Sequence, residues 1–237
     1  MDAIKRQLEA HGYALVHRCV SEETIEALET ALDADQHGIR NLLSNQVVRR
    51  IAGSDEVRKS VASVLGAECF AVRGIFFNKS PKANWKVMWH QDCAIAVREK
   101  LHIDGWGPRS NKAHVIHVSP ELSVLQQMLA IRIHLDDCGE DNGPLRVILG
   151  SHRDGFLSDA EIQNRSKENA VVCAVLRGDA ILMRPLLLHS SAPAVKPSNR
   201  RVVHLEFAAA ELPHGAKWQD RVHAEKFLTR KSACGCQ

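Results

Sequence analysis

Two histidines, one aspartate and one arginine have types and spacing that suit an iron centre. His90 and Asp92 form a His-x-Asp triplet around Gln91, and far downstream His189 is followed eleven positions later by Arg200. Two imidazoles and one carboxylate on one side of Fe(II) leave the opposite positions open to a chelating co-substrate and to dioxygen. An arginine fork beside them would match a carboxylate of that co-substrate. The pattern is typical of non-haem iron oxygenases.

A His-x-acid triplet alone is weak evidence, because the chain has thirteen histidines. The same pattern recurs at His102/Asp104, His134/Asp136, His152/Asp154, His204/Glu206 and His223/Glu225. An apolar stretch before His90 distinguishes the first triplet and indicates that it opens a strand, whose alternation places His90 and Asp92 on one face. His134 with Asp136 is the main rival metal pair, but it has no matching downstream histidine and arginine.

Four motifs occur in the order typical of one enzyme family. They are Asn78-Lys79-Ser80-Pro81, Trp89-His90-Gln91-Asp92, Asp141-Asn142-Gly143-Pro144-Leu145 with Gly150-Ser151-His152, and His189-Ser190-Ser191 followed by Arg200. On these motifs the chain resembles the phytanoyl-CoA dioxygenase family of Fe(II)/2-oxoglutarate oxygenases, which also includes ectoine hydroxylase. The resemblance runs from Gly12 to about Trp218. One departure is Leu149, where the family usually has proline, and it leaves the ligand set unchanged.

The resemblance implies a metal triad and a carboxylate clamp. His90, Asp92 and His189 would hold Fe(II), and Arg200 would pair with the distal carboxylate of 2-oxoglutarate. Without Arg200, His189 would be interpreted as a core histidine, and Arg200 taken alone could be a solvated arginine at the start of a strand. Arg201 competes for the clamp, because alternation points it the opposite way, but the family offset from the distal histidine selects Arg200.

Further contacts to the co-substrate are implied on neighbouring segments. Ser191 lies two positions beyond His189, so it could share its face and offer a hydroxyl to the same carboxylate. By resemblance, Asn78 would be a further contact and Arg132 would border the 2-oxoglutarate. Ser191 and Asn78 are equally compatible with ordinary turn residues. Alternation over residues 131–135 places Arg132 and His134 on one polar face. That face is either the interior of a barrel, where both residues line the site, or the water-exposed face of an edge strand.

The implied reaction uses dioxygen, converts 2-oxoglutarate to succinate and CO2, and hydroxylates a substrate. Halogenation is disfavoured, because the related halogenases replace the acid that is present here as Asp92. No basic cluster for the phosphates of coenzyme A is visible, so we expect a small polar or natural-product-like substrate. Gln91, Arg98 and His134 are the candidate substrate-binding residues.

Apolar patterns predict helices first and strands later. Ser21 is a good N-cap for a helix over Glu22–Leu32, and a second helix containing Val57 and Val61 ends at Gly66. Short apolar runs then predict strands at 70–77, 87–97, 129–135, 145–149, 171–176, 180–183 and 201–208. This spacing favours a mainly β fold with flanking helices, built on a double-stranded β-helix (cupin-like jelly-roll) core.

The whole chain, 1–237, is expected to form one oxygenase domain. It would comprise a helical part over about 1–66, a jelly-roll core over about 67–212 and a C-terminal tail. Residues 98–120 are long for a loop and therefore suggest a binding loop or lid. Cys234-Gly235-Cys236 lacks a second cysteine pair for zinc and is expected to belong to a disordered tail.

Composition and net charge limit the classes of binding partner and the cellular locations that we expect. The net charge of +3 without a basic patch argues against nucleic acid, and the absence of a long apolar run argues against a membrane span. Seven dispersed cysteines fit reduced thiols rather than disulfides, and no signal-peptide core follows Met1, so a cytoplasmic location is expected.

Two other functions remain open at this stage. The same His/His/Asp set suits a zinc hydrolase with an activated water, although Arg200 would then have no role. A non-enzymatic small-molecule-binding jelly roll is also compatible with the fold, although it would not need the metal ligands.

Overall fold

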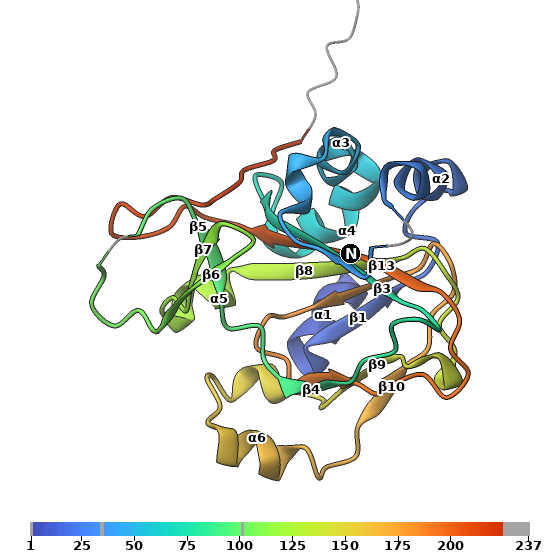
Figure 1. The fold of residues 1–237 in the computed structure, drawn as a ribbon. Coiled ribbons are helices and arrows are strands. Elements are labelled where there is room, and N and C mark those ends of the chain that lie inside the picture. The colour runs from blue at the N-terminus through green and yellow to red at the C-terminus, as the bar shows by residue number, and fades with distance from the viewer. Residues whose placement is uncertain (1, 34–35, 101, 225–237) are drawn as a thin grey trace, which may run out of the picture.

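Strands dominate the architecture, with helices on its outside (Figure 1). The computed structural model describes residues 2–33, 36–100 and 102–224. The helices are α1 (Asp2–His11), α2 (Glu22–Ala31), α3 (Gln46–Gly53), α4 (Asp55–Leu65), α5 (Leu122–Gln126) and α6 (Asp159–Arg165), and short 3-10 turns occupy Leu42–Ser44, Glu140–Asn142 and Ser151–Arg153. The strands are β1 (Tyr13–Val16), β2 (Gly38–Ile39), β3 (Phe70–Lys79), β4 (Val87–His90), β5 (Ile95–Val97), β6 (Arg109–Lys112), β7 (Val115–Val118), β8 (Met128–His134), β9 (Leu145–Val147), β10 (Val171–Cys173), β11 (Ala180–Met183), β12 (His189–Ser191) and β13 (Arg200–Ala208).

Two antiparallel sheets form the core. The larger has the order β1-β11-β8-β13-β3-β2, and the smaller has the order β10-β9-β12-β4. An apolar cluster that includes Val147 and Cys173 from the smaller sheet and Ile181 and Met183 from the larger one fills the space between them. This is the jelly-roll fold predicted from the strand spacing.

Helices α2, α3 and α4 cover the outer face of the larger sheet (Figure 1). Ser21 caps α2 as predicted, since its side chain accepts a hydrogen bond from the Thr24 amide. Apolar residues of these helices, including Leu28 and Val61, pack in one cluster with Ile131 and Leu205 of the sheet. None of the helices in the described ranges combines the length and apolar character that crossing a bilayer requires.

Residues 98–120 contain regular structure where a long loop was predicted. Strands β6 and β7 lie in this segment and pair with β5 as a third sheet of order β5-β7-β6, at the left of Figure 1. The sequence of β6, Arg109–Lys112, is polar throughout, so it has no apolar alternation from which a strand could be predicted. An apolar cluster that includes Ile95, Val118 and Trp218 anchors this small sheet.

Candidate metal centre

The His-x-Asp triplet and His189 converge at the end of β4. His90 is the last residue of that strand and lies opposite His189 of β12 in the antiparallel register. The His90 Nε2 atom lies 3.8 Å from one Asp92 carboxylate oxygen, and His189 Nε2 lies 3.7 Å from the other. Asp92 lies just beyond β4 rather than on it, so the expected strand alternation does not position it. Its amide donates instead to the Pro185 carbonyl, 2.8 Å away.

Each histidine is held in the tautomer that a metal ligand needs. The Nδ1 atom of His90 lies 2.8 Å from the Met88 carbonyl, and Nδ1 of His189 lies 2.8 Å from the Leu187 carbonyl. Because a carbonyl only accepts, each Nδ1 carries the proton and each Nε2 keeps its lone pair. Both lone pairs therefore belong to the nitrogens nearest Asp92.

The electrostatics also suit a divalent cation. Burial alone would raise the pKa of Asp92, but its electrostatic interactions with the His189, His204 and His90 imidazoles lower it to about 2. Burial lowers the pKa of His189 to about 4. At neutral pH the carboxylate is therefore ionised and His189 is neutral, which are the metal-binding forms.

The three donor groups fit a shared metal ion. One donor atom from each residue lies within 4.8 Å of the others, and across the described ranges no other group of three His, Cys, Asp or Glu side chains does so. The gaps between His and Asp atoms exceed hydrogen-bond length, yet each atom is a ligand that Fe(II) or Zn(II) accepts. The rival pair does not assemble, because Asp136 binds Arg201 instead.

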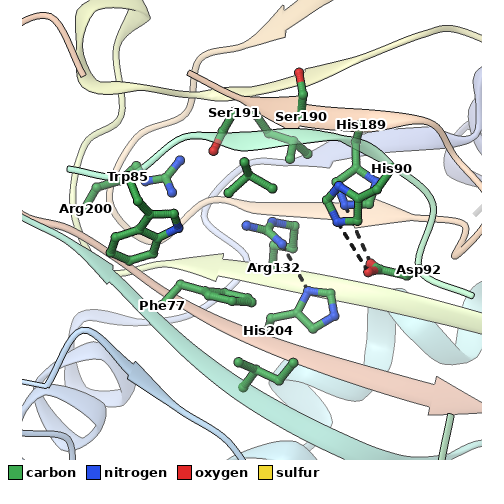
Figure 2. Close-up of a pocket in the computed structure, with 13 residues that line it drawn as sticks. Phe77, Trp85, His90, Asp92, Arg132, His189, Ser190, Ser191, Arg200 and His204 are labelled. Atoms are coloured by element: carbon green, nitrogen blue, oxygen red, sulfur yellow. Dashed lines mark hydrogen bonds and ion pairs between the residues drawn. The ribbon is translucent and has the colours of Figure 1, made fainter. Parts of the chain in front are cut away.

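A cavity of about 100 Å³ extends from the triad between the two sheets. The smaller sheet contributes Val87, His90, Leu145, His189, Ser190 and Ser191, and the larger sheet contributes Ile75, Phe77, Arg132, Arg200 and His204, with Trp85 and Asp92 from connecting segments. Figure 2 shows the triad at one end and Arg200, Ser191 and Trp85 at the other, with Arg132 between them. The triad and Arg200 therefore line opposite ends of the same cavity.

Strand alternation in β13 selects Arg200 over Arg201 for the cavity. Arg200 lines the cavity, whereas Arg201 turns to the other face and pairs with Asp136 and Glu29. The buried Arg200 guanidinium donates from Nη1 to the Gly143 carbonyl, while its Nε has no hydrogen-bond partner in the structure. Free donor capacity thus remains on this side chain.

Lys79 lies beside Arg200 in the β3–β13 register and was not predicted as a site residue. Its side chain is buried, with 1% exposure, and Nζ donates to Ser191 Oγ at 2.8 Å and to the Ala192 carbonyl at 2.9 Å. Burial, together with the Arg200 charge, lowers the pKa of Lys79 to about 8. Its neighbour Asn78, predicted to contact the co-substrate, is in register with Arg201 and does not line the cavity.

A chain of polar contacts holds Arg132 on the cavity floor. Its Nη1 donates to His204 Nδ1 at 3.2 Å, and His204 Nε2 lies 3.3 Å from Glu206, which also pairs with Arg73 at 3.0 Å. Since arginine can only donate, His204 Nδ1 must accept and Nε2 must carry the proton. His204 and Glu206 form one of the recurrent His-x-acid pairs, and nothing in that pattern marked it as part of the site.

Asp92 is the one acid among the described residues that line the cavity, and it does not form a salt bridge with the nearby cations. In the described part of the chain, Lys79, Arg132 and Arg200 form no ion pair with any carboxylate, and Arg132 Nε, like Arg200 Nε, lacks a hydrogen bond. Burial lowers the pKa of Arg132 to about 10. Unpaired buried cations are costly, so this arrangement favours an anionic ligand.

The three candidate substrate-binding residues lie outside the cavity lining. Gln91 is buried, and its amide group bonds the backbone of Gly155, Leu157 and Leu186. Arg98 is exposed and reaches only the Gln219 carbonyl. His134 is buried beside the cavity, and burial with the nearby arginine charges lowers its pKa well below the ordinary value. Residues 95–120 do not line the cavity either.

Three solved structures illustrate which proteins share this fold. EvdMO1 matches with a TM-score of 0.66 at 20% identity over 87% of this chain and 49% of that chain, so this chain spans about half the length of EvdMO1. EctD from S. alaskensis with 2-oxoglutarate and 5-hydroxyectoine gives 0.67 at 19% identity, over 88% and 76%. The non-haem α-ketoglutarate-dependent epimerase SnoN from nogalamycin biosynthesis gives 0.66 at 15%, over 95% of both chains.

Sequence comparison gives the family directly. No curated protein matches the chain significantly. The family model for phytanoyl-CoA dioxygenase (PhyH), however, matches residues 8–202, which is most of the sequence. The match contains all four motifs on which the resemblance was based. The chain therefore belongs to the phytanoyl-CoA dioxygenase (PhyH) family.

Proposed function

We propose that the protein is an Fe(II)- and 2-oxoglutarate-dependent oxygenase that hydroxylates a small polar or natural-product-like metabolite. One observation carries the proposal: the candidate metal triad and two buried arginines, Arg132 and Arg200, line one cavity, and the buried Lys79 adjoins it through its bond to Ser191. Membership of the PhyH family and the iron- and 2-oxoglutarate-containing EctD structures support it. A zinc hydrolase would not explain the cations.

In this proposal His90, Asp92 and His189 hold the iron. Bound Fe(II), 2-oxoglutarate and dioxygen supply the oxidising chemistry, with succinate and CO2 as co-products. The carbonyls of Met88 and Leu187 keep both imidazoles oriented by accepting from Nδ1. The side chains of His90 and Asp92 are 40% and 29% exposed, so a substrate can approach the metal from this side.

The opposite end of the cavity binds the co-substrate. Arg200 and Lys79 meet the distal carboxylate of 2-oxoglutarate, and Ser191 adds a hydroxyl that Lys79 already orients. Arg132 lies between the clamp and the triad and stabilises the anionic ligand along its length. The rings of Phe77 and Trp85 also line the cavity, with Arg132 over Phe77 and Lys79 over Trp85.

Hydroxylation is the outcome that we propose among those this machinery supports. Structures with the same fold include an epimerase and a carbocyclase, both described as α-ketoglutarate-dependent. These reactions can start from the same oxidant. They differ in how the substrate is positioned and in how the oxidised substrate is converted to product. Product analysis by mass spectrometry decides between them, because hydroxylation adds one oxygen atom to the substrate.

The first experiment needs no substrate. Metal-free protein is titrated anaerobically with Fe(II) and then with 2-oxoglutarate, and the visible charge-transfer band of the chelate is recorded. We expect a band that disappears in His90→Ala and weakens in Arg200→Ala. His17→Ala is the matched control, since the His17 side chain is 73% exposed and lies outside the cavity lining. Metal binding without any band would refute the oxygenase and favour the hydrolase or the binding protein.

A further inference from the structure

A second cavity, of about 340 Å³, shares no lining residue with the metal cavity. It lies where α1, the end of α5 and the segment before β12 meet. Its lining residues are Glu9, Leu125, Gln126, His152, Arg153, Arg184, Pro185 and Leu186. It is three times the volume of the metal cavity, so it has room for a small organic molecule.

Two arginines in this cavity lack a salt bridge, although Glu9 interacts electrostatically with Arg184. Across the described residues, neither Arg153 nor Arg184 forms an ion pair. Arg184 Nη1 reaches only the carbonyls of Gln126 and Met128, at 3.4 and 3.3 Å, and Arg153 Nη1 reaches the Glu9 carbonyl at 3.4 Å. These contacts are longer than strong charge-assisted bonds, so most of the donor capacity of both forks is unused.

The opposing charge at the cavity is small. Glu9 is the single acid among the lining residues, and it is exposed on α1. Burial and the two arginine charges lower the pKa of His152, so this imidazole is neutral at pH 7. Arg153 is exposed like Glu9, and Arg184 is partly buried, so two guanidinium groups beside one carboxylate leave a net positive cavity.

We propose that this second cavity binds the phosphoryl group of a small molecule. Two arginine forks match the several oxygens and the charge of a phosphoryl dianion better than those of a single carboxylate. Leu125, Pro185 and Leu186 provide an apolar wall for the body of the same molecule. Neither the triad nor the co-substrate clamp contributes to this site.

The site adjoins the segment that supports the metal triplet. The Pro185 carbonyl accepts from the Asp92 amide at 2.8 Å, and the Leu186 carbonyl accepts from Gln91 Nε2 at 2.8 Å. A ligand held by Arg184 and Pro185 therefore contacts the same short segment that positions Asp92. If the proposed iron site is correct, occupancy here and Fe(II) binding should influence each other reciprocally.

Calorimetric titration of the metal-free protein with inorganic phosphate tests the site. We expect saturable binding that weakens about tenfold or more in Arg184→Lys and in Arg153→Ala, since each variant removes charge-assisted bonds. Arg98→Ala, which removes an exposed arginine outside both cavities, should bind phosphate like the unmodified protein. Circular dichroism checks that each variant is folded.

Three results would overturn the proposal. They are the absence of saturable phosphate binding, unchanged binding in both arginine variants, and loss of binding in Arg200→Ala, which would place the anion in the metal cavity. The titration contains neither iron nor 2-oxoglutarate. Its failure would therefore leave the proposed oxygenase function untouched, and failure of the charge-transfer experiment would leave the phosphate site untouched.

Discussion

Replacing Lys79 with methionine should weaken 2-oxoglutarate binding without destabilising the empty protein. Lys79 is 1% exposed and has only Ser191 Oγ and the Ala192 carbonyl as hydrogen-bond partners. Loss of a hydrogen bond to a charged ligand costs about 1.5–3 kcal/mol, which corresponds to roughly a 10- to 150-fold higher Kd. Removing a buried, unpaired charge should at the same time leave the melting temperature unchanged or raise it.

The opposite signs of these two effects separate a ligand contact from structural damage. Anaerobic titration with Fe(II) and 2-oxoglutarate measures the affinity, and thermal unfolding without ligand measures the stability. Lys82→Met, at an exposed position three residues further along, removes the same charge and should change neither. A Kd within twofold of the unmodified value, or a fall in the melting temperature alongside the loss of affinity, would refute the reasoning.

Gly143→Ala should lower both the melting temperature and the 2-oxoglutarate affinity. The melting temperature should fall because Gly143 has φ of +62° and an added Cβ would lie 2.7 Å from the Ala192 carbonyl oxygen. The affinity should fall because the Gly143 carbonyl accepts a hydrogen bond from Arg200. Thermal unfolding and the same titration measure both, and an unchanged affinity would exclude this support for Arg200. Gln91→Leu should weaken Fe(II) binding about 10- to 100-fold, since the Gln91 amide bonds to three backbone groups and so anchors the triplet. Equilibrium dialysis measures the Fe(II) affinity, and an affinity equal to that of the unmodified protein would rule out a positioning role. Burial lowers the pKa of Lys79 to about 8. Below pH 8 this residue is therefore charged in both the folded and the unfolded chain. Between pH 8 and about 10 only the unfolded chain keeps the proton. The contribution of Lys79 to the free energy of unfolding should therefore rise with pH across this window, while the affinity for 2-oxoglutarate falls. Denaturant titrations measure the stability trend. The same trend in the unmodified protein and in Lys79→Met would contradict the prediction.

Alternation was the part of the site that the sequence could predict. Arg132 on β8 and Arg200 on β13 line the cavity at positions that follow from strand alternation. Ser191 also lines the cavity, but all three residues of β12 do so, and its pairing with β4 shifts register between His189 and Ser191. The family spacing settled the choice between Arg200 and Arg201, which alternation alone left open. The jelly-roll class followed from the number and spacing of apolar runs.

Register and irregular backbone account for the rest. Neither Asn78 nor Lys79 lines the cavity, but Lys79 bonds to Ser191, which does, and this contact depends on how β3 pairs with β13, which no local pattern specifies. Asp92 reaches the triad from beyond the end of β4 through its bond to Pro185, a residue more than ninety positions away. His204 resembled four other His-x-acid pairs until its strand was placed against Arg132.

The two halves of the site belong to different sheets, and this has a mechanical consequence. His90 and His189 lie on the smaller sheet, whereas Lys79, Arg132 and Arg200 lie on the larger one. A co-substrate held by iron at one end and by these cations at the other would connect the two sheets to each other. The bond between Lys79 and Ser191 already ties the layers at one point. Loading the site should therefore slow hydrogen exchange in both sheets together, including strands that never touch the ligand.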